Sequence, residues 1–222
     1  MDNSGGRMAV TITKQELSAL PAMTYEGRVV MVDSLEKAEL AVAELKGEIT
    51  LGFDTETKPS FKRGQMNKVA LMQIATRSCC YLFRLNKIGI PDGLRSILED
   101  SNILKIGVSI HDDFHNLKKI TDIQPEGFLD LQSFVKGYHI ADNSLSRIYG
   151  ILFNKRISKG QRLTNWEAAE LTPFQQAYAA LDAAACIQIY DYLIEDKFSA
   201  QNSIYWRDIT PPSPSSKEAV KP

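Results

Sequence analysis

The chain has 222 residues and a formal net charge of −1, with 44% hydrophobic and 24% charged residues. This composition is typical of a globular protein large enough to bury a core, and the near-neutral charge excludes a histone-like binder that works through bulk charge. The three cysteines, Cys79, Cys80 and Cys186, have neither the number nor the spacing of a disulfide framework or a zinc site.

The N-terminal part of the chain alternates strand patterns with helix patterns. Residues 1–24 are expected to form an arm, in which residues 1 to about 12 are loose and Thr13–Glu16 has the spacing of a capping box. That box predicts a short helix ending near Pro21. Apolar runs and helical spacing predict strands at Arg28–Val32, Ile49–Phe53, Lys68–Ile74, Cys79–Phe83 and Ile103–Val108, and helices at Ser34–Leu45 and Gly93–Glu99. The third and fourth of these strands are close enough in sequence to pair as a hairpin.

Strand patterns disappear after about residue 130, and helical patterns follow. We expect helices at Leu131–Tyr138, Ser144–Leu152 and Pro173–Glu195, the last with Pro173 in its first turn. Residues 208–222 are rich in proline and serine, which predicts a disordered tail. We therefore expect residues 25–207 to form a single α/β domain in which helices flank a sheet.

Neither end of the chain carries a targeting or membrane signal. The start lacks the basic and apolar regions of a signal peptide, and no apolar stretch approaches the roughly 18 residues of a membrane span. We expect a cytoplasmic protein that has no membrane partner, and no segment indicates a required protein partner.

Two carboxylates follow the second predicted strand. Side chains alternate along a strand, so Asp54 and Glu56 project to one face while Phe53 and Thr55 project to the other. Two carboxylates on one face repel each other unless a cation lies between them. Taken alone, the pattern fits a solvated strand end as well as a metal site.

A tyrosine and an acid share one face of the last predicted helix. Tyr178 and Asp182 are four residues apart in an alanine-rich stretch, whose small side chains let the helix lie close to another element or to a substrate. A tyrosine in this position is more often part of a core. An unpaired carboxylate among apolar neighbours is unfavourable, however, so Asp182 indicates a cation.

A further pair of acids, Asp112 and Asp113, follows the fifth predicted strand and opens a helical segment. Two interpretations stay open here. Acids in a first helical turn complement the helix dipole, and carboxylates near other acids can hold a metal ion.

Two stretches of the chain carry basic residues without any acid. Between Glu56 and Val69, and again between Asn154 and Leu163, such residues could neutralise phosphates, while nearby aromatic and Met side chains could stack on bases. Alternatively, the basic residues lie in solvated loops, and Trp166, which follows the second stretch, is part of the core. The candidate nucleic-acid contacts are Lys62, Arg63, Lys68, Lys159, Arg162 and Trp166.

Taken together, these segments resemble the DEDD superfamily of 3′–5′ exonucleases, in its tyrosine subclass, over residues from about 28 to 195. The chain looks most like the Werner-syndrome exonuclease domain and is more distantly similar to ribonuclease D. The matching segments are Gly52–Glu56, Arg63–Ile74, Gly107–Ile110 followed by Asp113, Asn165–Trp166 and Tyr178–Asp182. The resemblance implies a ribonuclease-H-like exonuclease fold, with a mixed central β-sheet flanked by helices.

The resemblance also implies a role for each acid. Asp54, Glu56 and Asp182 would hold one divalent metal ion, with Asp54 bridging to a second ion that Asp113 helps to hold. Asp113 is implied rather than its neighbour because it stands six residues after Gly107. The expected cofactors are two Mg²⁺ ions, with Mn²⁺ as the alternative ion.

The implied reaction is two-metal hydrolysis of a nucleic acid with a free 3′ end, which releases 5′-mononucleotides. Tyr178 would hydrogen-bond the attacking water, and an ordinary tyrosine pKa near 10 suits an orienting group better than a base. DNA is slightly favoured over RNA as the substrate. The resemblance places Arg162 and Trp166 on the substrate side. This favours nucleic-acid binding by the basic loops, whereas a core position stays favoured for Trp166.

Two other classes of function compete with this interpretation. A catalytically inactive nucleic-acid-binding module on the same fold would be marked by the loss of one acid, and none is lost. An integrase or endonuclease of the ribonuclease-H-like fold would also cluster acids, but the pattern of Tyr178 and Asp182 on one helix is not theirs.

Overall fold

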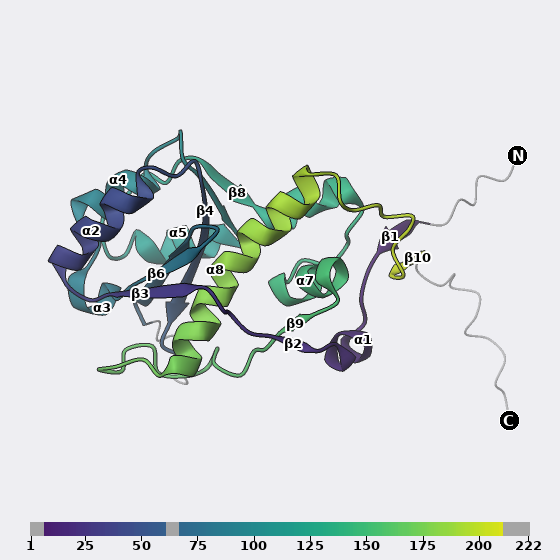
Figure 1. Cartoon of the computed structure of the whole chain (residues 1–222), viewed down its shortest axis with the longest axis horizontal. Helices are drawn as coiled ribbons and strands as arrows, with labels where there is room; N and C mark the ends of the chain where they lie inside the picture. Colours follow the sequence, from purple (N-terminus) through teal and green to yellow (C-terminus); the bar gives the residue numbers. More distant parts are fainter. Residues whose placement is uncertain (1–6, 61–66, 211–222) are drawn as a thin grey trace, which may run out of the picture.

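A six-stranded mixed sheet forms the centre of the computed structural model, which describes residues 7–60 and 67–210 (Figure 1). One strand, β5, runs antiparallel to both of its neighbours, and the other adjacent pairs are parallel. This arrangement confirms the expected mixed sheet. In spatial order the strands are β3 (Arg28–Val32), β6 (Cys79–Phe83), β5 (Val69–Ala75), β4 (Thr50–Thr57), β7 (Leu104–Gly107) and β8 (Phe128–Asp130).

Helices cover both faces of the sheet. On one face α2 (Leu35–Leu45), α4 (Asp92–Leu98) and α5 (Ile110–Leu117) bury the apolar side of β4, which includes Leu51 and Phe53. On the other face the long helix α8 (Pro173–Ile194) crosses the strands, as Figure 1 shows, and α7 (Leu145–Phe153) packs beside it. The alternation of side chains along β4 therefore directs neighbouring residues into two separate layers.

The close approach of α8 to the sheet depends on small residues. Gly52 of β4 faces α8, and a Cβ atom there would overlap the carbonyl oxygen of Ala183. Ala179, Ala180 and Ala183 are fully buried against the sheet. The alanine-rich helix thus lies directly on the backbone of the strand that carries Asp54 and Glu56.

The two ends of the described chain pair with each other. Strand β1 (Met8–Val10) is antiparallel to β10 (Trp206–Asp208), and Val10 and Ile12 are fully buried. The expectation of a loose arm is therefore wrong for residues 8–12, because their apolar side chains complete a core with α7 and α8. Residues 1–6 and 211–222, where the rest of the arm and most of the predicted tail fall, lie outside the described residues.

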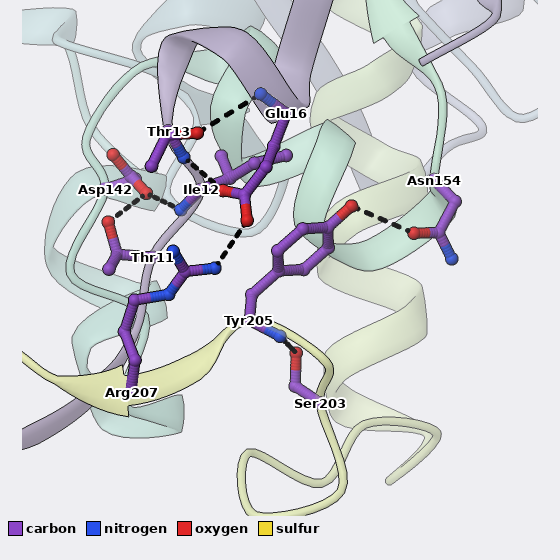
Figure 2. Close-up of polar contacts among 9 residues, drawn as sticks. All are labelled: Thr11, Ile12, Thr13, Glu16, Asp142, Asn154, Ser203, Tyr205 and Arg207. Atoms are coloured by element: carbon purple, nitrogen blue, oxygen red, sulfur yellow. Dashed lines mark hydrogen bonds and ion pairs between the residues drawn. The ribbon is translucent and has the colours of Figure 1, made fainter. Parts of the chain in front are cut away.

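Figure 2 shows the polar contacts that join these terminal segments. The Arg207 guanidinium donates to the Glu16 carboxylate at 2.9 Å, and the Asp142 carboxylate accepts from Thr11 Oγ1 and Ile12 N, each at 2.9 Å. Glu16 also closes the predicted capping box with Thr13 at the start of α1 (Lys14–Ala19). The terminal segments are thus held by charged and capping contacts as well as by β-pairing.

Several elements differ from the sequence prediction. The segment Leu131–Tyr138 is not one helix but a short α6 (Leu131–Phe134) followed by a 3₁₀ turn, η1 (Val135–Tyr138). Strands do occur near and after residue 130, because β8, β9 (Arg156–Ile157) and β10 are two or three residues long and pair with distant segments. The partner of β9 is β2 (Ala22–Met23), and a short helix α3 (Leu85–Ile88) was not expected.

Among the described residues, no helix has the length and apolarity to cross a membrane.

Candidate active site

Strand β4 presents two acids to the face that α8 covers. The strand continues past Phe53, where it was expected to end, as far as Thr57, so Asp54 and Glu56 are part of the sheet. Asp54 and Glu56 stand one and three residues after the buried Phe53, which places them opposite the apolar layer, as the alternation predicts. The pairing with β5 shifts register between Glu56 and Thr57, and this bulge lies directly beside the acids.

Helix α8 supplies Tyr178 and Asp182 to the same place. Pro173 occupies the first turn as predicted, and a capping box between Thr172 and Gln175 fixes the start of the helix. Tyr178 lies one helical turn before Asp182, and burial together with the nearby Asp182 charge raises the pKa of the Tyr178 hydroxyl. The helix therefore holds its acid and its tyrosine beside each other.

Three of the predicted acids form a compact group. One carboxylate oxygen from each of Asp54, Glu56 and Asp182 lies within 4.8 Å of the other two. Glu56 and Asp182 are buried, and Asp54 is half-buried. Oxygen ligands at this spacing fit a hard divalent cation such as Mg²⁺ or Mn²⁺, and a cation would relieve the repulsion between the buried carboxylates.

The pKa values of these acids reflect that repulsion. Burial, together with the charges of Asp182 and Asp113, raises the pKa of Glu56 to about 9. Burial and the neighbouring acids also raise the pKa of Asp54 well above its usual value, and burial raises the pKa of Asp182 to about 7. Without a cation, the group therefore holds protons that a metal ion would displace.

Asp113 joins the group from the opposite side of β4. Its carboxylate accepts a hydrogen bond from Thr55 Oγ1, and its charge raises the pKa values of both Asp54 and Glu56. Burial raises the pKa of Asp113 itself to about 6, whereas Asp112 is exposed to solvent. Asp113 is thus the member of this pair that faces the acidic group.

The turn before Asp113 is conformationally unusual. Ser109, at the start of α5, has a φ of 62°, in the left-handed region that non-glycine residues adopt at a cost. Its backbone N–H donates to the Asp130 carboxylate at 3.2 Å. Asp130 also caps α6, so it links β8, α6 and the turn that positions α5. Sequence reasoning missed the roles of Thr55 and Asp130, since both depend on contacts between segments that are distant in the sequence.

The basic loop before Trp166 lies near the acids, although its side chains are exposed. Arg162 lowers the pKa of Glu56, and Lys159 lowers the pKa of Asp182, because each brings positive charge close to the carboxylate. Lys68 is exposed just before β5. Lys62 and Arg63, the other two predicted contacts, lie outside the described residues.

Trp166 does not reach solvent. Its side chain has 0% exposure and packs among Leu71, Leu82 and Leu171 in the layer beneath α8. Its ring lies 6.1 Å from that of Tyr178, centroid to centroid. Direct contact with a nucleic acid, one of our two predictions for Trp166, is therefore wrong, and the core position is confirmed.

A small cavity opens beside Tyr178. It has a volume of about 150 Å³, and its wall includes Tyr25, Gln161, Phe174 and Tyr178. Phe174 and Tyr178 are four residues apart on α8, and Phe174 is 77% exposed, which is unusual for a large aromatic side chain. Sequence reasoning missed Tyr25 and Phe174, because their approach to each other depends on the tertiary fold.

Comparison with known proteins identifies this arrangement. A family model described as 3′–5′ exonuclease matches residues 29–196. The mouse bifunctional 3′–5′ exonuclease/ATP-dependent helicase WRN is 34% identical over 149 residues, which are 64% of this chain and 11% of that protein. A 3′–5′ exonuclease of Arabidopsis thaliana is 31% identical over 189 residues, which are 78% of this chain and 66% of that protein.

Solved structures share the fold. The EXO domain of Aedes aegypti Nibbler has a TM-score of 0.71 at 23% identity, over 80% of this chain and 95% of that one. Escherichia coli RNase D has a TM-score of 0.67 at 19% identity, over 78% of this chain and 45% of that one. Since the family model covers most of the folded chain and the acids lie on the expected elements, the chain belongs to the DEDD superfamily of 3′–5′ exonucleases and resembles WRN within it.

Proposed function

We propose that the chain hydrolyses the terminal phosphodiester of a nucleic acid from its 3′ end and releases 5′-mononucleotides. The observation that carries this proposal is the group formed by Asp54, Glu56 and Asp182, whose ligand oxygens lie within 4.8 Å of one another. Buried carboxylates that repel one another are costly to a fold, and a phosphodiesterase metal site gives them a purpose.

The donor set fits two divalent ions, Mg²⁺ or Mn²⁺. Asp54, Glu56 and Asp182 would hold one ion, and Asp54 with Asp113 would hold the second. Such a pair, when bound, supplies an activated water and stabilises the leaving 3′ oxygen. Asp113 suits a weaker, partly water-mediated contact, since it lies outside the compact group but close enough to raise the pKa values of Asp54 and Glu56.

Tyr178 serves to orient the attacking water. Burial raises its pKa far above the ordinary value for tyrosine, so the hydroxyl keeps its proton at neutral pH. Its ring packs near that of Trp166, with 6.1 Å between the centroids. A protonated hydroxyl can hydrogen-bond the water but cannot act as a general base.

Basic and aromatic side chains near the acids would hold the strand. Lys159 and Arg162 bring positive charge to the acidic group, and we assign the same role to Lys68, which is exposed just before β5. We assign the same role to Lys62 and Arg63, which the described residues do not include. The cavity between Tyr25 and Phe174 is a place where a base could stack beside Tyr178.

DNA is our first candidate substrate and RNA is the second. DNA is the substrate that the resemblance of the sequence to the Werner-syndrome exonuclease domain implies. RNA is supported by the Trypanosoma brucei RNase D structure solved with RNA U12, whose fold matches with a TM-score of 0.66.

Degradation of matched 5′-labelled DNA and RNA strands, single or recessed in a duplex, tests this proposal. We expect shortening by one nucleotide at a time in Mg²⁺ or Mn²⁺, with DNA degraded faster than RNA. Internal fragments would indicate an endonuclease instead, and binding without cleavage would indicate an inactive binding module. Faster degradation of RNA would overturn only the choice of substrate.

A further inference from the structure

Gln73, in the middle of β5, has a buried side chain without a partner. It is 0% exposed, and neither atom of its amide has a hydrogen-bond partner among the described residues. A buried amide that loses water without gaining a hydrogen bond costs a fold roughly 1–3 kcal/mol. Such a group in an otherwise satisfied core requires an explanation from its surroundings.

The position of Gln73 places it beside the acidic group. In the antiparallel pair of β4 and β5, Gln73 stands directly opposite Asp54, and on its other side it stands opposite Leu82 of β6. Residues directly opposite each other share a face, with Cβ atoms roughly 4.5–5.5 Å apart. The Gln73 side chain therefore starts from the same face of the sheet as Asp54, the face that α8 covers.

Much of the layer around Gln73 is apolar. Side chains of β5, β6 and α8 form this layer of the core. They include Leu71, Ala75, Cys80, Leu82, Ala179, Ala180 and Ala183. Among the acids of the site, Asp54 is the one that stands directly opposite Gln73 in the sheet.

The chemistry of the two groups is complementary. An ionised carboxylate is an acceptor at both oxygens, and the Gln73 amide carries two N–H donors. A carboxylate that bridges two cations must present both oxygens in a fixed orientation, and hydrogen bonds from neighbouring groups supply that orientation in metal sites. Gln73 can donate from the neighbouring strand of the sheet, directly across from Asp54.

We propose that Gln73 is a positioning residue for the active site, whose amide N–H donates to the Asp54 carboxylate and fixes it for metal binding. The inference rests on the proposed function, because that proposal makes Asp54 a metal ligand. It explains why an amide is kept in a layer where an apolar side chain of the same size would pack without cost.

Replacement of the amide by a thioether of similar length tests the inference. Gln73→Met should leave the metal-free protein as stable as wild type or more stable, because an unpaired amide is removed. Its affinity for Mn²⁺, measured by calorimetry, should fall about 10–100-fold. The kcat on a nucleic acid strand at fixed Mn²⁺ should fall, while KM for the strand stays unchanged.

Met72→Leu is the matched control. Met72 is the adjacent residue of β5, is equally buried and faces the opposite layer. This variant should bind Mn²⁺ as the wild type does. A defect of equal size in both variants would show that any change in the core of β5 disturbs the site, and would overturn the inference.

The outcomes separate this inference from the proposed function. If the wild type binds no Mn²⁺, the proposed function fails. If the wild type binds Mn²⁺, Asp54→Asn does not, and Gln73→Met binds like the wild type, the role of Gln73 alone is overturned. A second variant, Gln73→Leu, guards against a folding defect that only the Met substitution causes. If neither variant folds, the Gln73 side chain is needed for folding, and that result would also overturn the inference.

Discussion

Tyr178 and Asp182 lie one turn apart on α8, close enough for the Asp182 charge to add to burial in raising the pKa of Tyr178, so one helix holds both the proposed water-orienting group and a proposed metal ligand. The helix can occupy this place because Gly52 and the alanines of α8 allow its backbone to lie on β4. The chemistry of the site and its packing therefore both depend on the contact between α8 and β4.

Tyr178→Phe removes the hydroxyl and keeps the ring. We expect kcat to fall roughly 10²-fold, as for the loss of one positioned hydrogen-bond donor, while the affinity for Mn²⁺ changes little because Asp182 remains. Steady-state kinetics and calorimetry measure the two effects. The control is Tyr149→Phe. The Tyr149 hydroxyl donates a hydrogen bond of 2.8 Å to Gln188, which is on α8 but outside the acidic group. Equal losses in both variants would contradict the assignment.

Glu56→Gln should stabilise the metal-free protein. The pKa of Glu56 is raised from 4.5 to about 9 in the folded state, so the folded protein keeps a proton that the unfolded chain releases between these values. The cost to folding is absent below about pH 4.5 and grows as the pH rises towards 9. At pH 7 the variant should be more stable by about 1 kcal/mol or more, which corresponds to a rise in Tm of about 2–4 °C.

Thermal unfolding from pH 4 to 9, with and without Mn²⁺, measures this effect. The wild type should gain stability on adding Mn²⁺, and Glu56→Gln should gain much less. The control variant Glu39→Gln changes an exposed acid of α2 and should follow the wild type. A Tm difference between Glu56→Gln and wild type that shrinks as the pH rises would contradict the prediction.

Gly52→Ala places a methyl group against the carbonyl oxygen of Ala183. Because backbone cannot move aside as a flexible side chain can, we expect a loss of about 3 kcal/mol or more of unfolding free energy, with loss of metal binding as α8 shifts. Urea unfolding measures the first effect and calorimetry the second. Gly137→Ala is the control, since a Cβ there has no atom within 4 Å. Similar stability of the two variants would rule out the close approach.

Arg162→Ala should weaken the binding of the strand rather than the chemistry. We expect KM to rise about 3–10-fold and the salt dependence of binding to become shallower by about one unit in the log–log slope, since one phosphate contact is lost. Kinetics over a range of salt concentrations measure both. The control is Lys46→Ala. Lys46 is exposed at the end of α2, on the opposite face of the sheet, so this variant should change neither KM nor the salt dependence. An unchanged KM in Arg162→Ala would exclude the contact.

Phe174→Ala tests whether the cavity beside Tyr178 receives a base. The loss of one stacking contact should cost roughly 1–3 kcal/mol of binding, seen as a higher KM for the strand. Ile204→Ala removes another exposed apolar side chain, 80% exposed and outside the lining of the cavity, and serves as the control. If both variants keep the wild-type KM, the cavity does not hold the strand.

Long apolar patterns predicted the central elements well. The sheet strands at 28–32 and 79–83, the hairpin between β5 and β6, the cap of α1 and the first turn of α8 follow from periodicity and capping chemistry that any reader of the sequence can apply. These features are local, so neighbouring residues determine them. The short terminal strands could not be predicted, because β1 and β10 each have three residues and gain their stability from each other across almost the whole chain.

The residues of the candidate site likewise divide into those that local sequence patterns predict and those that depend on distant segments. The alternation along β4 and the spacing on α8 placed Asp54, Glu56 and Asp182 on the faces where the structure has them. The burial of Trp166 depends on a layer built from distant strands, and an indole ring in a sequence fits a core as well as a nucleic-acid surface. The missing partners of Gln73 could not be read from an apolar strand pattern either, since they depend on what stands opposite in the sheet.

The most direct test of the account compares wild type with Asp182→Asn on a 5′-labelled single strand, in Mg²⁺ and in EDTA. We expect the wild type to shorten the strand from its 3′ end in Mg²⁺ and to stop in EDTA. Asp182→Asn should stay folded and leave the strand intact in both. Shortening that persists in EDTA or in the folded variant, or no shortening by the wild type in either Mg²⁺ or Mn²⁺, would contradict metal-dependent hydrolysis at this acidic group.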